Sequence, residues 1–156
     1  MKKNILVVSY SRTGKTKFVS YKVSKKLGAD YLELSDGNSR KGFFGLLKSL
    51  FEVIQKKTPV LNEFEINPSS YDLVIVASPV WGGTMSSLTR SFLCSWGKLI
   101  KKIAFIVTSD GSEPQNFLDE SISFSKKPVA FLQVSKNDFK DPSIIDSKIA
   151  NFLKLV

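Results

Sequence analysis

Apolar runs alternate with amphipathic segments along most of the chain. Each run is apolar on both alternations and rich in β-branched side chains, a pattern typical of parallel strands that are covered on both faces. The runs are Ile5–Val8, Leu73–Ala77, Ile103–Val107 and Val129–Leu132. A shorter and more mixed run, Tyr31–Leu34, is typical of a strand at the edge of a sheet. Together these segments predict five strands.

The amphipathic segments between the runs are predicted to form helices. In each of them an apolar side chain recurs every three or four residues, so that one face of the helix can cover the sheet. The apolar stripes comprise Val19, Val23 and Leu27; Phe43, Leu47, Leu50, Phe51 and Ile54; Leu88, Phe92 and Trp96; and Ile145, Ile149, Phe152 and Leu153. A weaker segment, Pro114–Phe124, is predicted to hold a short helix. This alternation predicts an α/β fold, a doubly wound parallel sheet with helices on both faces.

The aromatic stripe from Phe43 to Ile54 has two interpretations. Its periodicity favours a helix that covers the sheet. In the alternative, Phe43 and Phe44 lie exposed and form part of a surface for a substrate or a partner.

Length and composition limit the class of protein. A chain of 156 residues with 42% hydrophobic and 24% charged residues is typical of one globular domain, here residues 1–156. We expect no membrane span, because no apolar run is long enough, and no signal peptide. The single cysteine, Cys94, indicates the reducing cytoplasm, and its neighbours Phe92, Leu93 and Trp96 predict a buried structural role.

Histidine is absent, which excludes Ser-His-Asp and Cys-His nucleophile pairs and any His-ligated metal. A bound cofactor is then the expected agent of any chemistry. The net charge of +9 would suit an acidic partner or nucleic acid. However, the lysines occur in scattered pairs such as Lys25-Lys26 and Lys126-Lys127, which indicates solvated helix faces and does not favour nucleic acid.

The turn after the first strand has the composition of a phosphate-binding loop. It contains Ser11, Arg12, Thr13, Gly14, Lys15 and Thr16, and a helix follows. Backbone amides at the start of a helix point towards an anion, and the helix dipole favours negative charge there. The hydroxyl groups can donate further hydrogen bonds, and the glycine allows a ligand to approach the backbone closely.

Three interpretations of this turn are open from its residues alone. One is a site for the phosphate of a flavin nucleotide. The second is a P-loop-like nucleotide-binding enzyme, because Gly14-Lys15-Thr16 matches the end of G-x-x-x-x-G-K-[ST], although Ser9 stands where the first glycine belongs. The third is a helix whose serine and threonine residues serve only as caps.

A second motif follows the predicted strand Leu73–Ala77. Here the buried strand leads into a loop that carries Pro79, Val80, Trp81 and Gly82. A tryptophan beside glycines finds little to pack against in its own loop, whereas it provides a flat apolar wall for a flat aromatic ligand. The alternative is that Trp81 is tucked under its own loop.

These two motifs resemble those of the flavodoxin family. SYSRTGKT is similar to its phosphate loop and YDLVIVASPVWGGTM to its second flavin loop, and the order of elements agrees over essentially the whole chain. The resemblance implies a five-stranded flavodoxin-like sheet of order 2-1-3-4-5 that binds FMN at the carboxyl ends of its strands. It implies that the phosphate is held by Ser11, Arg12, Thr13, Gly14, Lys15 and Thr16. It also implies that the flavin ring is lined by Pro79, Val80, Trp81 and Gly82, with Ser109, Asp110 and Gly111 at its pyrimidine edge.

The function implied by the resemblance is electron transfer through bound FMN. The protein would be either an electron carrier with a redox partner protein or a small reductase that uses NAD(P)H to reduce quinones or nitro compounds. The net charge of +9 differs from that of the family's electron carriers, which are typically acidic. A homodimer is also possible.

The side chain of Asp110 has two interpretations. It would either face the flavin ring or form a turn that faces water.

Overall fold

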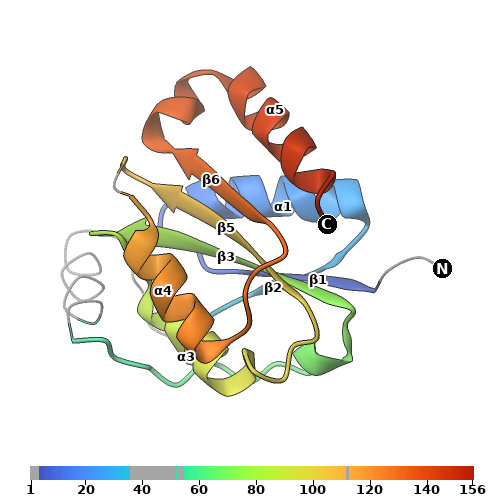
Figure 1. Ribbon diagram of the computed structural model, residues 1–156, viewed down its shortest axis with the longest axis vertical. Coiled ribbons are helices and arrows are strands. Elements are labelled where there is room, and N and C mark those ends of the chain that lie inside the picture. Colours follow the sequence, from blue (N-terminus) through green and yellow to red (C-terminus); the bar gives the residue numbers. More distant parts are fainter. Residues whose placement is uncertain (1–3, 36–51, 53–54, 112) are drawn as a thin grey trace.

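The computed structural model describes residues 4–35, 52, 55–111 and 113–156, and a twisted sheet forms its centre (Figure 1). The strands are β1 (Ile5–Ser9), β2 (Asp30–Glu33), β3 (Leu73–Trp81), β4 (Thr84–Met85), β5 (Ile103–Ser109) and β6 (Phe131–Ser135). The helices are α1 (Lys15–Leu27), α3 (Ser87–Trp96), α4 (Gln115–Phe124) and α5 (Pro142–Leu153), and short 3-10 turns form η1 (Pro68–Ser70) and η2 (Lys136–Lys140). Within this described part of the chain, no helix combines the length and the apolar character needed to cross a membrane.

The described strands form one six-stranded sheet with the spatial order β2-β1-β3-β5-β6, and β4 pairs with the end of β3. Every pairing along this path is parallel. Val7 of β1, for example, lies opposite Tyr31 on one side and Ile75 on the other. Counted without β4, this is the predicted order 2-1-3-4-5, so the predicted flavodoxin-like topology is confirmed.

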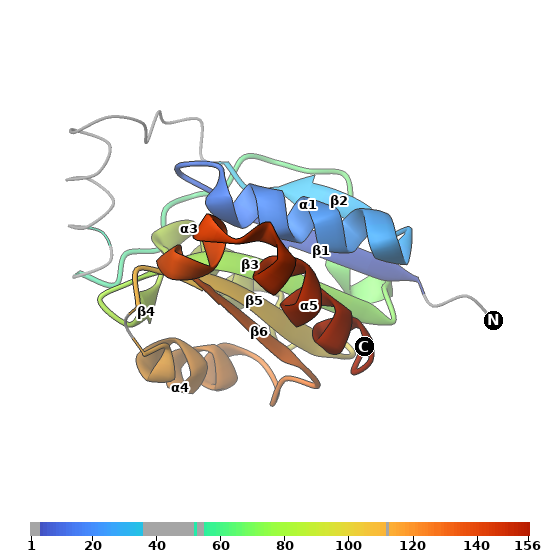
Figure 2. The ribbon, with the colours of Figure 1, turned by 90° about the horizontal axis from the view of Figure 1, so that it is seen from above.

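Alternate side chains of each strand point to opposite faces of the sheet, and helices cover both faces. On one face Val7 belongs to an apolar cluster with side chains of α1 and α5. On the other face Val76 belongs to a cluster with α3 and α4, including Phe92 and Phe117. Figure 2 shows α1 and α5 together on one side of the sheet and α4 on the other. The central strands can therefore be apolar on both alternations, as the sequence pattern indicated.

The third strand is longer than predicted. The pattern predicted an end at Ala77, but β3 continues to Trp81. Its last residues pair with β5, with Val80 opposite Ser109. The chain around Pro79 is therefore part of the sheet, which fixes its position relative to the end of β5.

The segment predicted as an open loop after this strand is a tight hairpin. Trp81 pairs with Thr84 of β4 in antiparallel fashion, and Gly82 and Gly83 form the turn between them. The two glycines have φ angles of 57° and 79°, and a two-residue hairpin of this twist requires positive φ at both positions. The glycines are thus explained by the turn itself.

Two further predictions are wrong in detail. Cys94 is exposed, because it lies on the outer side of α3 while Phe92 and Leu93 face the core. β6 begins at Phe131, later than the predicted Val129.

The aromatic stripe predicted between α1 and β3 lies outside the described residues. Its residues are Phe43, Phe44, Leu47, Leu50, Phe51 and Ile54.

The hairpin glycines provide a matched pair of substitutions. Alanine at either position would be strained by roughly 1–2 kcal/mol, because both backbones are left-handed. At Gly83 the new Cβ would also lie 3.0 Å from the carbonyl oxygen of Glu113, whereas at Gly82 no described atom outside its immediate neighbours lies within 4 Å. We expect Gly83→Ala to lower the free energy of unfolding more than Gly82→Ala, as measured by urea denaturation. Equal losses would contradict the packing of the hairpin on the β5–α4 segment.

Candidate functional site

A small cavity lies at the edge of the sheet where the parallel strands end. Its volume is about 220 Å³, and its walls come from the carboxyl ends of β3 and β5 and from the segments that follow β1 and β6. Parallel strands joined by helices place all of these segments at the same edge. The lining residues are Arg12, Thr13, Lys15, Thr16, Pro79, Val80, Trp81, Thr108, Ser109, Asp110, Lys136 and Phe139.

The first turn of α1 forms one wall of this cavity. Gly14 precedes the helix with φ of 91°, and its amide donates to Oγ of Ser11 at 3.0 Å, which folds the turn onto itself. Gly14 has no side chain that could cap the helix, so the amides of the first turn are left for an anion. Lys15 and Thr16, the first helical residues, both line the cavity.

Two cationic side chains of the same turn border the cavity. Nε of Arg12 is buried, and no hydrogen-bond partner for it lies among the described residues. Nζ of Lys15 lies 5.4 Å from the ring centre of Phe139. A buried donor without a partner is costly unless a ligand accepts its hydrogen bond. The Nε of Arg12, the two positive charges and the start of α1 therefore fit an anionic group such as a phosphate.

Hydrogen bonds between hydroxyl groups hold the walls together behind the cavity. Oγ1 of Thr16 and Oγ1 of Thr108 are 2.7 Å apart and buried, which ties the start of α1 to β5. Oγ of Ser20 donates to Oγ of Ser9 at 3.0 Å, which ties the same helix to β1. These bonds position the turn relative to the sheet through protein groups alone, as a preformed site requires.

Trp81 is the last residue of β3 and forms a second wall of the cavity. Its ring contacts that of Tyr10 edge to face, with the centroids 6.5 Å apart and the planes at 88°. Trp81 is partly buried, and it packs against the same apolar cluster as Phe92 while also lining the cavity. An aromatic surface of this kind beside an anion site suits a planar ring that carries an anionic group.

Most of the predicted site residues meet at this cavity. Those that line it are Arg12, Thr13, Lys15, Thr16, Pro79, Val80, Trp81, Ser109 and Asp110. Of the others, Ser11 and Gly14 lie in the same turn, and Gly82 lines a neighbouring, larger cavity. Gly111, with φ of 113°, follows Asp110 but does not line the cavity. The roles of these residues towards a ligand stay predictions.

The sequence analysis did not identify Lys136 and Phe139, which line the cavity from η2. Their signal lies in the topology, because η2 follows β6, and Ser135 at the end of β6 pairs with Ser109 of β5. A segment that follows a parallel strand lies at the same edge as the other loops. The place of η2 after the last strand, rather than its composition, could have shown that it reaches the site.

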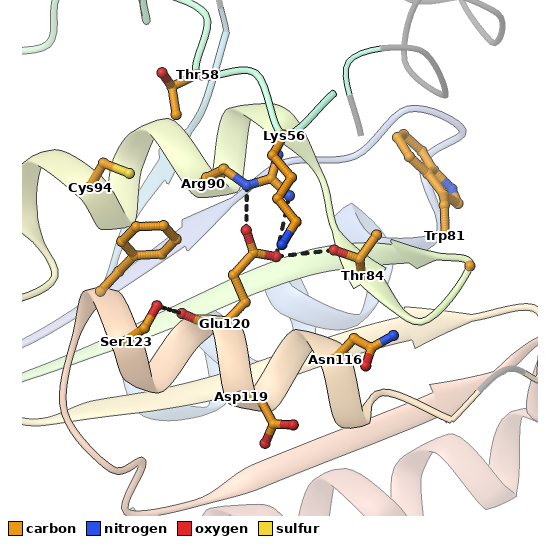
Figure 3. A pocket seen from close by; sticks show the side chains of 12 residues that line it. Lys56, Thr58, Trp81, Thr84, Arg90, Cys94, Asn116, Asp119, Glu120 and Ser123 are labelled. Atoms are coloured by element: carbon orange, nitrogen blue, oxygen red, sulfur yellow. Dashed lines mark hydrogen bonds and ion pairs between the residues drawn. The ribbon is translucent and has the colours of Figure 1, made fainter. Parts of the chain in front are cut away.

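The larger cavity, of about 1050 Å³, is shown in Figure 3. It adjoins the first at Trp81, which lines both. It is bordered by α3, α4, the β3–β4 hairpin, Lys56 and Thr58. Figure 3 shows Arg90 of α3 and Glu120 of α4 pointing towards each other. This cavity is large enough for a drug-sized molecule.

The charges of Arg90 and Glu120 are paired and nearly buried, with 2% and 12% of their side chains exposed. Oε1 of Glu120 accepts from Nε of Arg90 at 2.5 Å, and Oε2 accepts from Nη2 at 3.2 Å. Oε2 also accepts from Oγ1 of Thr84 at 3.0 Å, and Nη1 of Arg90 donates to the carbonyl oxygen of Lys57 at 3.3 Å. The pair therefore joins α3, α4 and β4 and holds the hairpin that carries Trp81.

Cys94 lines the larger cavity from α3. Partial desolvation raises the pKa of its thiol, and the charge of Arg90 acts in the opposite direction. Because the thiolate is the nucleophilic form, this direction of the pKa shift disfavours a nucleophilic role for Cys94.

Comparison with solved structures shows which fold this is. A flavoprotein from Lactobacillus acidophilus NCFM in complex with FMN has 20% sequence identity and a TM-score of 0.67, over 90% of this chain and 97% of that chain. A flavodoxin mutant from Fusobacterium nucleatum bound to flavin mononucleotide has 10% identity and a TM-score of 0.60, over 99% and 95% of the two chains. The apo form of an NADH:FMN oxidoreductase has 14% identity and a TM-score of 0.56, over 99% and 90%. The chain has a flavodoxin-like fold. No protein-family model and no curated protein matches the sequence.

The flavodoxin-like fold does not favour the alternative of a P-loop-like enzyme built on Gly14, Lys15 and Thr16. P-loop enzymes hold magnesium with an acidic residue of a second motif. Here β3 ends instead in Pro79, Val80 and Trp81.

The buried pair makes a prediction about stability. Glu120→Leu leaves the guanidinium of Arg90 buried without its partner, and we expect a loss of about 3–5 kcal/mol in the free energy of unfolding. The double substitution Arg90→Met with Glu120→Leu removes both charges, so we expect it to be more stable than the single variant. Urea denaturation of the three proteins measures both differences. A double variant less stable than Glu120→Leu would contradict this account of the pair.

Proposed function

We propose that this protein binds one FMN in the small cavity and transfers electrons through it. The observation that carries the proposal is the meeting of Trp81 with an anion site made from Arg12, Lys15 and the start of α1. FMN is a planar aromatic ring joined by a short chain to a phosphate, so both of its ends find a partner here. The FMN-bound flavoproteins of similar fold support the same assignment.

In this proposal the residues divide into two groups. The phosphate is held by Ser11, Arg12, Thr13, Gly14, Lys15 and Thr16, and the ring and its linking chain are lined by Pro79, Val80, Trp81, Gly82, Ser109, Asp110 and Gly111. When bound, FMN supplies one- and two-electron chemistry that side chains lack. The protein binds and orients the ring. The carboxylate of Asp110 disfavours reduced forms of the flavin ring that carry negative charge.

The net charge of +9 supports an acidic surface on the redox partner protein. The range of the attraction between the two proteins is set by the ionic strength. Because added salt screens this attraction, electron transfer to the partner should become slower as salt is added. The single cysteine further supports a location in the reducing cytoplasm.

FMN binding can be tested directly by titration, with quenching of flavin fluorescence as the readout. We expect the protein to bind FMN more tightly than riboflavin and to stay yellow through desalting. Because the second phosphate pKa is about 6, affinity for FMN should be greatest above that pH and should fall as the pH drops below it. Riboflavin affinity should not follow this pH dependence.

Substitutions in the turn refine this test. Backbone amides do much of the holding, so Arg12→Ala and Lys15→Ala should each weaken FMN binding, by about tenfold, without abolishing it. Lys98→Ala removes an exposed charge before the amino end of β5, remote from the cavity, and is the control. If Lys15→Ala alone abolished binding, this division between backbone and side chains would be refuted.

A second candidate function is a small NAD(P)H-dependent reductase of quinones or nitro compounds. The larger cavity favours it, because it adjoins the proposed ring site at Trp81 and has room for a second planar molecule. A pure electron carrier has no need of such a space.

The two functions can be distinguished under anaerobic conditions. For a reductase, we expect NADPH to bleach the absorbance of the bound flavin and a quinone such as menadione to restore it. Ser123→Trp would place a large side chain in the larger cavity and should lower kcat/KM for the quinone. Ile122→Trp is the matched control, because Ile122 is exposed on the same helix and does not line the cavity. The absence of bleaching by NADPH or NADH would favour the carrier.

A further inference from the structure

We propose that η2 (Lys136–Lys140) is a further recognition element of the phosphate site and makes it selective for a phosphorylated flavin. This inference rests on the proposed function and concerns residues that the two sequence motifs do not contain. Lys136 and Phe139 line the small cavity together with Arg12 and Lys15. They act in different ways, Lys136 by its own charge and Phe139 by holding Lys15.

Phe139 is a positioning residue for the ammonium group of Lys15. Nζ of Lys15 lies 5.4 Å from the centre of the Phe139 ring, within the range of a cation–π contact. The Phe139 ring also lies against that of Phe18 in α1, with the ring centroids 6.4 Å apart. A lysine in the first turn of a helix would otherwise move freely in water, so this contact keeps its charge beside the cavity.

The 3-10 turn is itself anchored by an ion pair to α5. Oδ2 of Asp138 accepts from the amide of Ser135 at 2.7 Å and from Nζ of Lys148 at 2.7 Å. Nζ of Lys148 also donates to the carbonyl oxygen of Gln133 at 3.3 Å. The Lys148 hydrogen bond lowers the pKa of Asp138, so this carboxylate stays charged over the pH range in which a phosphate takes up its second proton.

The charges around the cavity match a phosphate monoester. Arg12, Lys15 and Lys136 provide three positive charges, and Asp110 provides one negative charge, which leaves an excess of two. The phosphate of FMN carries about two negative charges at neutral pH. Riboflavin has the same ring and no phosphate, so it gains nothing from Lys136 or from the placement of Lys15.

Dissociation constants for FMN and riboflavin, measured side by side at low salt, test the role of Lys136. We expect Lys136→Met to weaken FMN binding by about threefold to tenfold and to leave riboflavin binding unchanged. Lys140→Met is the matched control, because it removes the same charge from the same turn at a residue that does not line the cavity. Equal effects of the two substitutions would reduce the role of Lys136 to general charge and overturn its assignment.

A double-mutant cycle tests the role of Phe139. Phe139→Leu should weaken FMN binding and spare riboflavin binding, whereas Phe139→Trp, which keeps an aromatic face, should retain the affinity for FMN. Because Phe139 acts through Lys15, adding Phe139→Leu to Lys15→Met should cause no further loss. Additive losses would overturn the positioning role.

The same measurements distinguish failure of the proposed function from failure of this inference. If the wild-type protein binds neither flavin, the proposed function itself fails. If the wild-type protein binds FMN, and neither Lys136→Met nor Phe139→Leu changes that affinity, only the assignment of η2 fails.

Discussion

The candidate site depends on the parallel pairing of β1, β3, β5 and β6. Parallel neighbours need a crossover between them, so every strand delivers its following segment to the same edge of the sheet. The turn at the start of α1, Trp81, Asp110 and η2 are distant in sequence and share one cavity for this reason. The register matters as much as the order, because a slip of one residue would turn each strand over and move its end by about 3.3 Å. Such a slip would break the Thr16–Thr108 hydrogen bond that joins two walls of the cavity.

The same constraint explains which features could be predicted from the sequence. The continuous apolar runs marked four of the five parallel strands, because a strand covered on both faces has no polar alternation, and the mixed run Tyr31–Leu34 marked the edge strand. The turn at Gly14 and the wall at Trp81 were found from residue types that phosphates and planar rings require. The short strand β4 was missed because two residues show no periodicity, although Gly82-Gly83 between β-forming neighbours is itself a hairpin signal. Cys94 was misplaced because sequence neighbours in a helix point about 100° apart, so apolar residues beside it do not bury it.

The pair of Arg90 and Glu120 connects the two cavities through the hairpin. Burying two charges costs free energy that their mutual attraction offsets only with good geometry, so such a pair is weak evidence of net stability. Its effect here is positional, since Thr84 of β4 joins the same carboxylate. The backbone of Trp81 pairs with Thr84, and its indole contacts the ring of Tyr10, so both the main chain and the side chain of Trp81 are positioned by neighbours. A wall held in this way can orient a planar ligand with little loss of conformational entropy on binding.

The net charge of +9 acts on two different length scales. In physiological salt the field of an exposed lysine falls off over about 8 Å, so most lysines of the protein contribute little to a ligand within the cavity. The electrostatic potential at a phosphate in the cavity would be set by the cations that line it. Among the described residues, these cations are Arg12, Lys15 and Lys136. The remaining lysines act together at the surface, where they can steer an acidic partner without choosing between one flavin and another. In the proposed function, selectivity for the ligand and attraction of a partner would therefore be separable, because different residues would carry them.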